Sequence, residues 1–88
     1  MCRNIKTLFN YDPPATEDEI YASSLQYVRK ISGFRKPSKS NNDAFEVAVA
    51  DIAKITKRLV DALETDAPLR DRIIEMEKAR ARAEKRFA

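Results

Sequence analysis

The clearest hydrophobic pattern in the chain lies between residues 42 and 64. Apolar side chains recur there at intervals of three and four residues, which is the spacing of one face of an α-helix. Basic and acidic side chains occupy the opposite side. The pattern predicts a helix over roughly 42–64, with Ser40, Asn41 and Asn42 as alternative N-caps. Its apolar stripe contains Phe45, Ala48, Val49, Ile52, Ile55, Thr56, Leu59, Val60 and Leu63.

A helix over roughly residues 16–32 is predicted by its end signals. Thr16 and Glu19 have the spacing of a capping box, in which each side chain accepts a hydrogen bond from the other residue's amide. Gly33 is well placed to end the helix in a left-handed conformation. The face expected to be apolar contains Ile20, Ser24, Tyr27, Val28 and Ile31.

A third helix is predicted over roughly residues 68–86, with Asp66 as its cap and Pro68 in its first turn. Its apolar face is interrupted by Arg80, so we expect it to bury less surface than the helix before it. The pattern leaves open whether this helix packs on the other two or projects from them. The tail, residues 78–88, is expected to fray. The apolar positions are Leu69, Ile73, Met76, Ala83 and Phe87.

The N-terminal residues are predicted to form a short anchor on the helices. Ile5, Leu8 and Phe9 are apolar, and either a helical turn or an extended segment fits their spacing. Pro13 and Pro14 then end any regular element. The expected fold is therefore all-α, a small bundle of about three helices in a single domain, residues 1–88. The stripe at 42–64 is wider than one partner helix needs, so the anchor or a second subunit of a homodimer is expected to cover the rest.

The composition disfavours several kinds of protein and of catalytic chemistry but does not identify a function. The 88 residues include one glycine, one cysteine and no histidine. A sheet protein, a disulfide framework, histidine catalysis and a histidine metal site are therefore all disfavoured. We expect no enzymatic activity and no cofactor. The apolar runs are too short to span a bilayer, and a lone thiol suits a reducing cytoplasm, so no membrane partner is expected.

Cys2 is the one candidate for catalysis. If Met1 is removed, the new terminal amine can activate the thiol, and nearby Arg3 and Lys6 favour the thiolate. The alternative interpretation, which we favour, is a small side chain that is packed or solvated and has no chemical role.

A run of basic residues is the better functional candidate. No acidic residue occurs between Ile20 and Asn42. The basic side chains there can contact nucleic-acid phosphates, another anion or an acidic protein, with Tyr27 and Phe34 near enough to stack on a base. The alternative interpretation is a solubilising loop. The five residues are Arg29, Lys30, Arg35, Lys36 and Lys39, hereafter the tip cations.

These observations favour a small non-enzymatic binding module that contacts nucleic acid through residues 29–39. Two other classes of function stay open. One is a helical protein-interaction module or homodimeric adaptor, and the other is a thiol-dependent activity at Cys2.

Four strings resemble a known family. They are MCRNIKTL at the start, PPAT before the first helix, QYVRKISGF at its end and KPS in the loop. The chain resembles the bacterial family called domain of unknown function 2277, from Met1 to about Leu63 and more loosely beyond. The resemblance implies a small, uncharacterised bacterial protein in the cytoplasm, with no known activity or site residue.

A weaker similarity is to the helical hairpin of J-domains. That family's functional loop carries a His-Pro-Asp tripeptide, and this chain reads Lys36-Pro37-Ser38 at the corresponding place. We therefore attribute the similarity to shared hairpin signals and expect no chaperone function.

Overall fold

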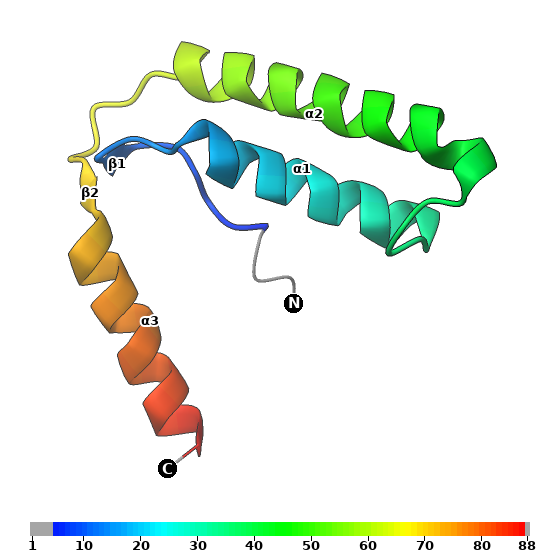
Figure 1. The fold of residues 1–88 in the computed structure, drawn as a ribbon. Helices are drawn as coiled ribbons and strands as arrows, with labels where there is room; N and C mark the ends of the chain where they lie inside the picture. The colour runs from blue at the N-terminus through cyan, green and yellow to red at the C-terminus, as the bar shows by residue number, and fades with distance from the viewer. Residues whose placement is uncertain (1–4, 88) are drawn as a thin grey trace.

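The protein is a helical hairpin with a third helix attached at its open end (Figure 1). The structure, a computed structural model, describes residues 5–87, with side chains as far as Lys85. The helices are α1, Glu17–Ser32; α2, Asn42–Ala62; and α3, Arg72–Phe87. A 3₁₀ turn, η1, spans Lys39–Asn41, and two short strands, β1 (Tyr11–Asp12) and β2 (Arg70–Asp71), pair in parallel. The prediction of a small, mainly α fold with three helices is confirmed.

The ends of α1 are those that the sequence predicts. The Glu19 amide donates to Thr16 Oγ1 at 3.2 Å, and the Thr16 amide donates to Glu19 Oε1 at 3.0 Å, which completes the capping box. At the other end Gly33 is left-handed, with φ of 76°, and its N–H donates to the Arg29 carbonyl at 3.0 Å. Because only glycine adopts this conformation without strain, Gly33 fixes where the chain leaves the helix.

The boundaries of α2 differ slightly from the predicted 42–64. Asn41 is the N-cap residue, but its side chain donates to Ser38 Oγ at 2.8 Å and makes no capping bond. The helix ends at Ala62, two residues early, because Leu63 is extended with ψ of 141°. The Ser38–Asn41 contact instead stabilises the turn that leads into α2.

The core of the hairpin is small. α1 and α2 lie side by side, and their buried side chains are Ile20, Ser24 and Val28 from α1 and Val49 from α2. Leu8 is also buried, as predicted for an N-terminal anchor. Two residues expected on the same face, Tyr27 and Ile31, are 47% and 66% exposed, because α2 covers a narrower strip of α1 than the pattern suggested.

The predicted start of the third helix, at residue 68, was wrong by four residues. The backbone just before Arg72 forms strand β2 and not helix. Arg70 N–H donates to the Asn10 carbonyl at 2.8 Å, and β2 pairs with β1. Asp71 is the residue that caps α3. Its Oδ1 accepts from the amides of Ile73 at 2.9 Å and Ile74 at 3.0 Å, a role that the sequence pattern had assigned to Asp66.

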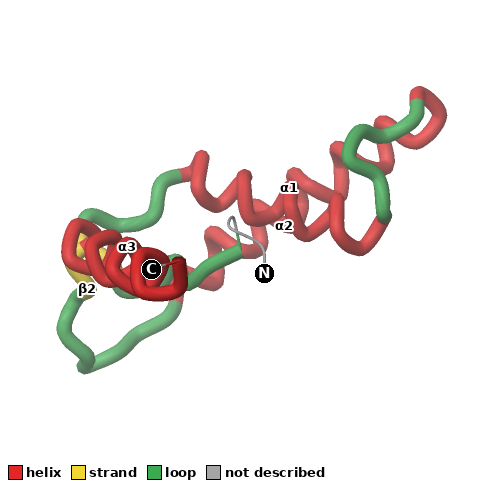
Figure 2. The backbone as a smooth tube through the Cα atoms, turned by 90° about the horizontal axis from the view of Figure 1, so that it is seen from below, coloured by secondary structure: helices red, strands yellow, loops and turns green. Residues whose placement is uncertain are grey.

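Helix α3 projects from the hairpin. Figures 1 and 2 show that it leaves the open end of the hairpin and packs along neither α1 nor α2. The molecule is thin, with extents of 44 × 38 × 16 Å, so the three helices lie in roughly one layer. Its radius of gyration of 15.6 Å exceeds the value of about 12 Å expected for a compact domain of this length.

Candidate functional site

The tip cations lie at the closed end of the hairpin, where α1 ends and α2 begins. Arg29 and Lys30 occupy the last turn of α1. Gly33 then reverses the chain, and Arg29 Nε donates to the Arg35 carbonyl at 3.1 Å, which ties the loop to the end of the helix. The local fold therefore positions Arg35 beside Arg29 rather than leaving the loop free.

Three of the five tip cations line one open hollow on the surface. Arg29, Lys30 and Arg35 surround a volume of about 400 Å³ together with Gln26 and Gly33. Lys36 and Lys39 do not line it; both are exposed in the adjoining loop and η1. The structure thus brings Arg29, Lys30 and Arg35 together. Lys36 and Lys39 lie further along the same loop.

The tip cations have no acidic partner within residues 5–85. The ion pairs in that range join Lys6 and Arg72 to Glu19, Lys57 to Asp61, and Lys78 to Glu75. Phe34 is 43% exposed next to Arg35, whereas Tyr27 lines a groove beside Ile5 and Ile52. An incoming anion would therefore meet unneutralised charge and one partly exposed aromatic ring at this end.

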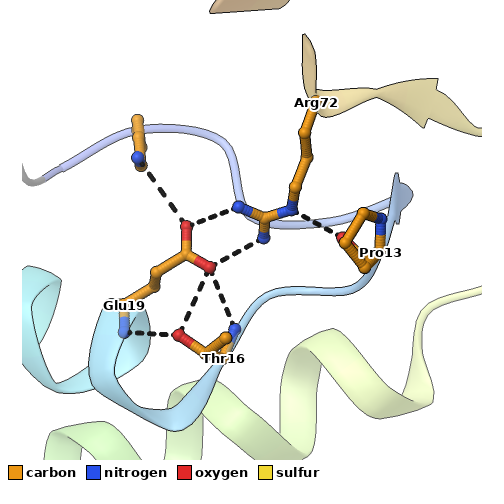
Figure 3. Close-up of polar contacts among 5 residues, drawn as sticks. Pro13, Thr16, Glu19 and Arg72 are labelled. Atoms are coloured by element: carbon orange, nitrogen blue, oxygen red, sulfur yellow. Dashed lines mark hydrogen bonds and ion pairs between the residues drawn. The ribbon is translucent and has the colours of Figure 1, made fainter.

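A second polar cluster, which the sequence did not reveal, joins the open end of the hairpin to α3 (Figure 3). Arg72 makes a two-pronged contact with Glu19, Nη1 to Oε2 at 2.9 Å and Nη2 to Oε1 at 2.7 Å. Arg72 Nε also donates to the Pro13 carbonyl at 2.6 Å. We call this set of contacts the Arg72 clamp, because one side chain holds α3, α1 and the N-terminal segment together.

The electrostatics of the clamp favour a permanently charged pair. The Glu19 pKa falls from 4.5 to about 2, mainly through the hydrogen bonds from Arg72 and then from the Thr16 amide, with burial opposing them. The same contact raises the pKa of Arg72. The Tyr11 ring lies 5.5 Å from the Arg72 guanidinium and 5.6 Å from that of Arg70. Glu19 is thus a fixed anion and not a proton acceptor for catalysis.

A cleft of about 340 Å³ opens beside the clamp, between the N-terminal segment and α3. Lys6, Tyr11, Glu19, Arg72 and Met76 are among the residues that line it. Of the two carboxylates that line it, Glu19 already accepts from Arg72 and Thr16, and Glu75 is paired with Lys78 at 3.7 Å. The polar contacts beside the cleft hold α3 to α1 and to the N-terminal segment, which is a structural role.

Cys2, the one candidate for catalysis in the sequence, lies outside the described residues. Among residues 5–85, no group of three metal-binding side chains is positioned to hold an ion.

The clamp escaped prediction for a simple reason. Glu19 was fully explained as a capping residue, and nothing in the spacing of the chain connects it to an arginine 53 positions later. Only the aromatic Tyr11 followed by two prolines hinted that the N-terminal segment is held in a defined conformation.

The fold defines a small helical-hairpin protein whose third helix is fixed only at its base. The chain belongs to the family of uncharacterized conserved proteins DUF2277, which it matches over residues 1–80. This confirms the resemblance seen in the opening strings. No curated protein and no solved structure matches the chain. Within the described part, no helix is long and apolar enough to cross a membrane.

Proposed function

We propose that this protein is a non-enzymatic binding module that contacts the phosphate backbone of nucleic acid through the tip cations. The observation that carries the proposal is the gathering of Arg29, Lys30 and Arg35 around one hollow, with no acidic partner for them in the described residues. Lys36 and Lys39 extend the same charge along the loop. Phosphate recognition needs little more than such a cluster of arginine and lysine.

The shape of the tip suits a backbone contact better than base reading. The hollow is open, and the Lys30 and Arg35 side chains that line it are exposed, which suits sequence-independent phosphate contacts. Phe34, beside Arg35, can add stacking on one exposed base, which favours single-stranded over double-stranded nucleic acid.

Removing three of the tip cations should weaken binding strongly. In the triple variant Arg35→Gln, Lys36→Gln and Lys39→Gln, we expect affinity for a single-stranded oligonucleotide to fall at least about tenfold at low salt. The dependence of log affinity on log salt should flatten by about one unit for each phosphate that the variant no longer binds. Fluorescence anisotropy across a salt series measures both quantities.

The matched control removes three cations that lie away from the tip, Lys54, Arg58 and Lys85, and leaves the net charge equal to that of the test variant. At about 0.1 M salt, where screening confines charge effects to roughly 10 Å, we expect it to bind within about threefold of the parent and more tightly than the test variant. Equal losses in both variants would mean that binding follows net charge alone. No binding of the parent protein to either DNA or RNA at low salt would refute the proposal.

A further inference from the structure

Helices α2 and α3 carry apolar side chains that no described residue covers. On α3, Ile73 is 69% exposed and Met76 is 64% exposed. On α2, Ile55 and Leu59 lie one turn apart on the edge of the predicted stripe and are 58% and 56% exposed. The edge of α2 at Ile55 and Leu59 and the flank of α3 at Ile73 and Met76 therefore each lack a partner among the described residues.

The total surface shows how much is uncovered. The chain exposes 7436 Å², whereas a folded monomer of 10.1 kDa exposes about 5,300 Å². The excess, about 2,100 Å², is close to what each subunit of an obligate dimer buries, roughly 1,000–2,500 Å². A single layer of helices cannot enclose a core, and a second layer would remove this excess.

Helix α3 also needs a partner for its own stability. It has 16 residues, and in the described part of the chain it is held at its first residue, through the Arg72 clamp, the contact of Arg72 with the Tyr11 ring and the preceding strand β2. A free helix of this length is only marginally stable in water, and most helices in proteins depend on packing of an apolar face.

The charges along the two helices are complementary in one orientation. Residues 42–53 of α2 have three acidic side chains and no basic one, whereas residues 54–62 have three basic and one acidic. In α3, residues 73–77 have two acidic side chains and no basic one, and residues 78–87 have five basic and one acidic. Apart from Arg72, whose charge is paired with Glu19, both helices are therefore acidic at the start and basic at the end. Antiparallel packing of α3 on α2 places unlike charges together, and parallel packing places like charges together.

We infer that the protein forms a homodimer in which α3 of each copy packs antiparallel on the Ile55–Leu59 edge of α2 in the other copy. Such an interface is self-complementary, as twofold symmetry requires, since each copy supplies one α2 edge and one α3 flank. It buries both uncovered surfaces at once. It also supplies the second layer that one copy lacks.

The same packing within one chain is opposed by the way α3 leaves the hairpin. β2 runs directly into α3, so the pairing of β1 with β2 and the contact of Arg72 with Glu19 fix the direction of the helix. That direction leads away from α2 (Figure 1). Folding back would break these contacts, whereas a second copy can approach without disturbing them.

Sedimentation equilibrium of the full chain tests the inference. The parent should sediment at twice the 10.1 kDa monomer mass. Met76→Asp and Leu59→Asp should each weaken the dimer at least about tenfold, because each places a charge in a buried apolar contact. The matched controls, Ala81→Asp on α3 and Ala50→Asp on α2, introduce the same charge on the far side of the same helices and should leave the dimer unchanged. A monomeric parent, or test variants that dimerise like the controls, would overturn the inference.

Disulfide trapping separates packing between copies from packing within one. In a Cys2→Ser background, a Leu59→Cys copy mixed with a Met76→Cys copy should form a mixed disulfide on oxidation, and the pair Ala50→Cys with Ala81→Cys should not. If instead the bond forms only within a single chain that carries both Leu59→Cys and Met76→Cys, α3 packs on its own α2 and the inference is wrong.

Discussion

Replacing Ile20 with alanine is expected to lower the free energy of unfolding by about 2–4 kcal/mol, because the side chain is 5% exposed in a very small core. A domain of this length has a total stability near 4–13 kcal/mol, and a thin molecule lies toward the lower end. The variant should therefore be close to unfolding at room temperature. Urea unfolding followed by far-ultraviolet circular dichroism, at fixed protein concentration, measures the loss.

The matched control for this experiment is Ile31→Ala in the same helix. Ile31 is 66% exposed, so the same substitution removes little buried surface and should cost less than about 1 kcal/mol. Equal losses from the two substitutions would show that Ile20 is not the centre of the hairpin core.

The second large effect is expected at the Arg72 clamp. Glu19→Gln keeps an acceptor for the Thr16 amide but loses the charged pair with Arg72. The Glu19 and Arg72 side chains are only 21% and 26% exposed. We expect a loss of about 2 kcal/mol. Hydrogen exchange should locate it, with the Arg70 amide losing the protection it gains from the Asn10 carbonyl.

Asp61→Asn is the matched control, since it also turns a carboxylate into an amide at an ion pair 2.7 Å long. Lys57 and Asp61 are 49% and 62% exposed, so this change should have little effect on the free energy of unfolding. If both substitutions cost the same, the clamp does not hold α3 to the hairpin.

The clamp also sets the response to acid. The Glu19 pKa is lowered to about 2 in the folded protein from 4.5, so its stabilising effect is fully present above pH 4.5 and is lost as the pH falls toward 2. Unfolding titrations between these values should show the parent losing stability more steeply than Glu19→Gln. Parallel curves for the two proteins would mean that Glu19 titrates normally.

Most of the helix assignment could be predicted from residues that lie close together in the sequence. The Thr16–Glu19 box and Gly33 bounded α1 correctly because caps depend on residues three or four positions apart. The start of α3 was misplaced because two aspartates, Asp66 and Asp71, have equal capping ability, and only pairing of Arg70 with Asn10 decides between them. Such pairing joins distant parts of the chain and leaves no periodic signal.

The same distinction between local and long-range contacts applies to the candidate site. The tip cations were visible because they are neighbours in sequence at the end of one helix. The clamp was not visible, since Glu19 and Arg72 meet only after three separate segments have taken their places. The extent of apolar exposure on α2 and α3 was likewise hidden, because periodicity identifies an apolar face but does not say whether anything covers it.

Binding of nucleic acid at the closed end of the hairpin, as proposed above, can be mapped residue by residue. In amide chemical-shift mapping of the full chain, titrated with a single-stranded oligonucleotide, we expect the largest shifts at residues 26–41, around the Arg29–Arg35 hollow. We expect little change at the Arg72 clamp. Shifts concentrated on α3 or on the cleft beside Lys6, with residues 26–41 unchanged, would contradict the proposal.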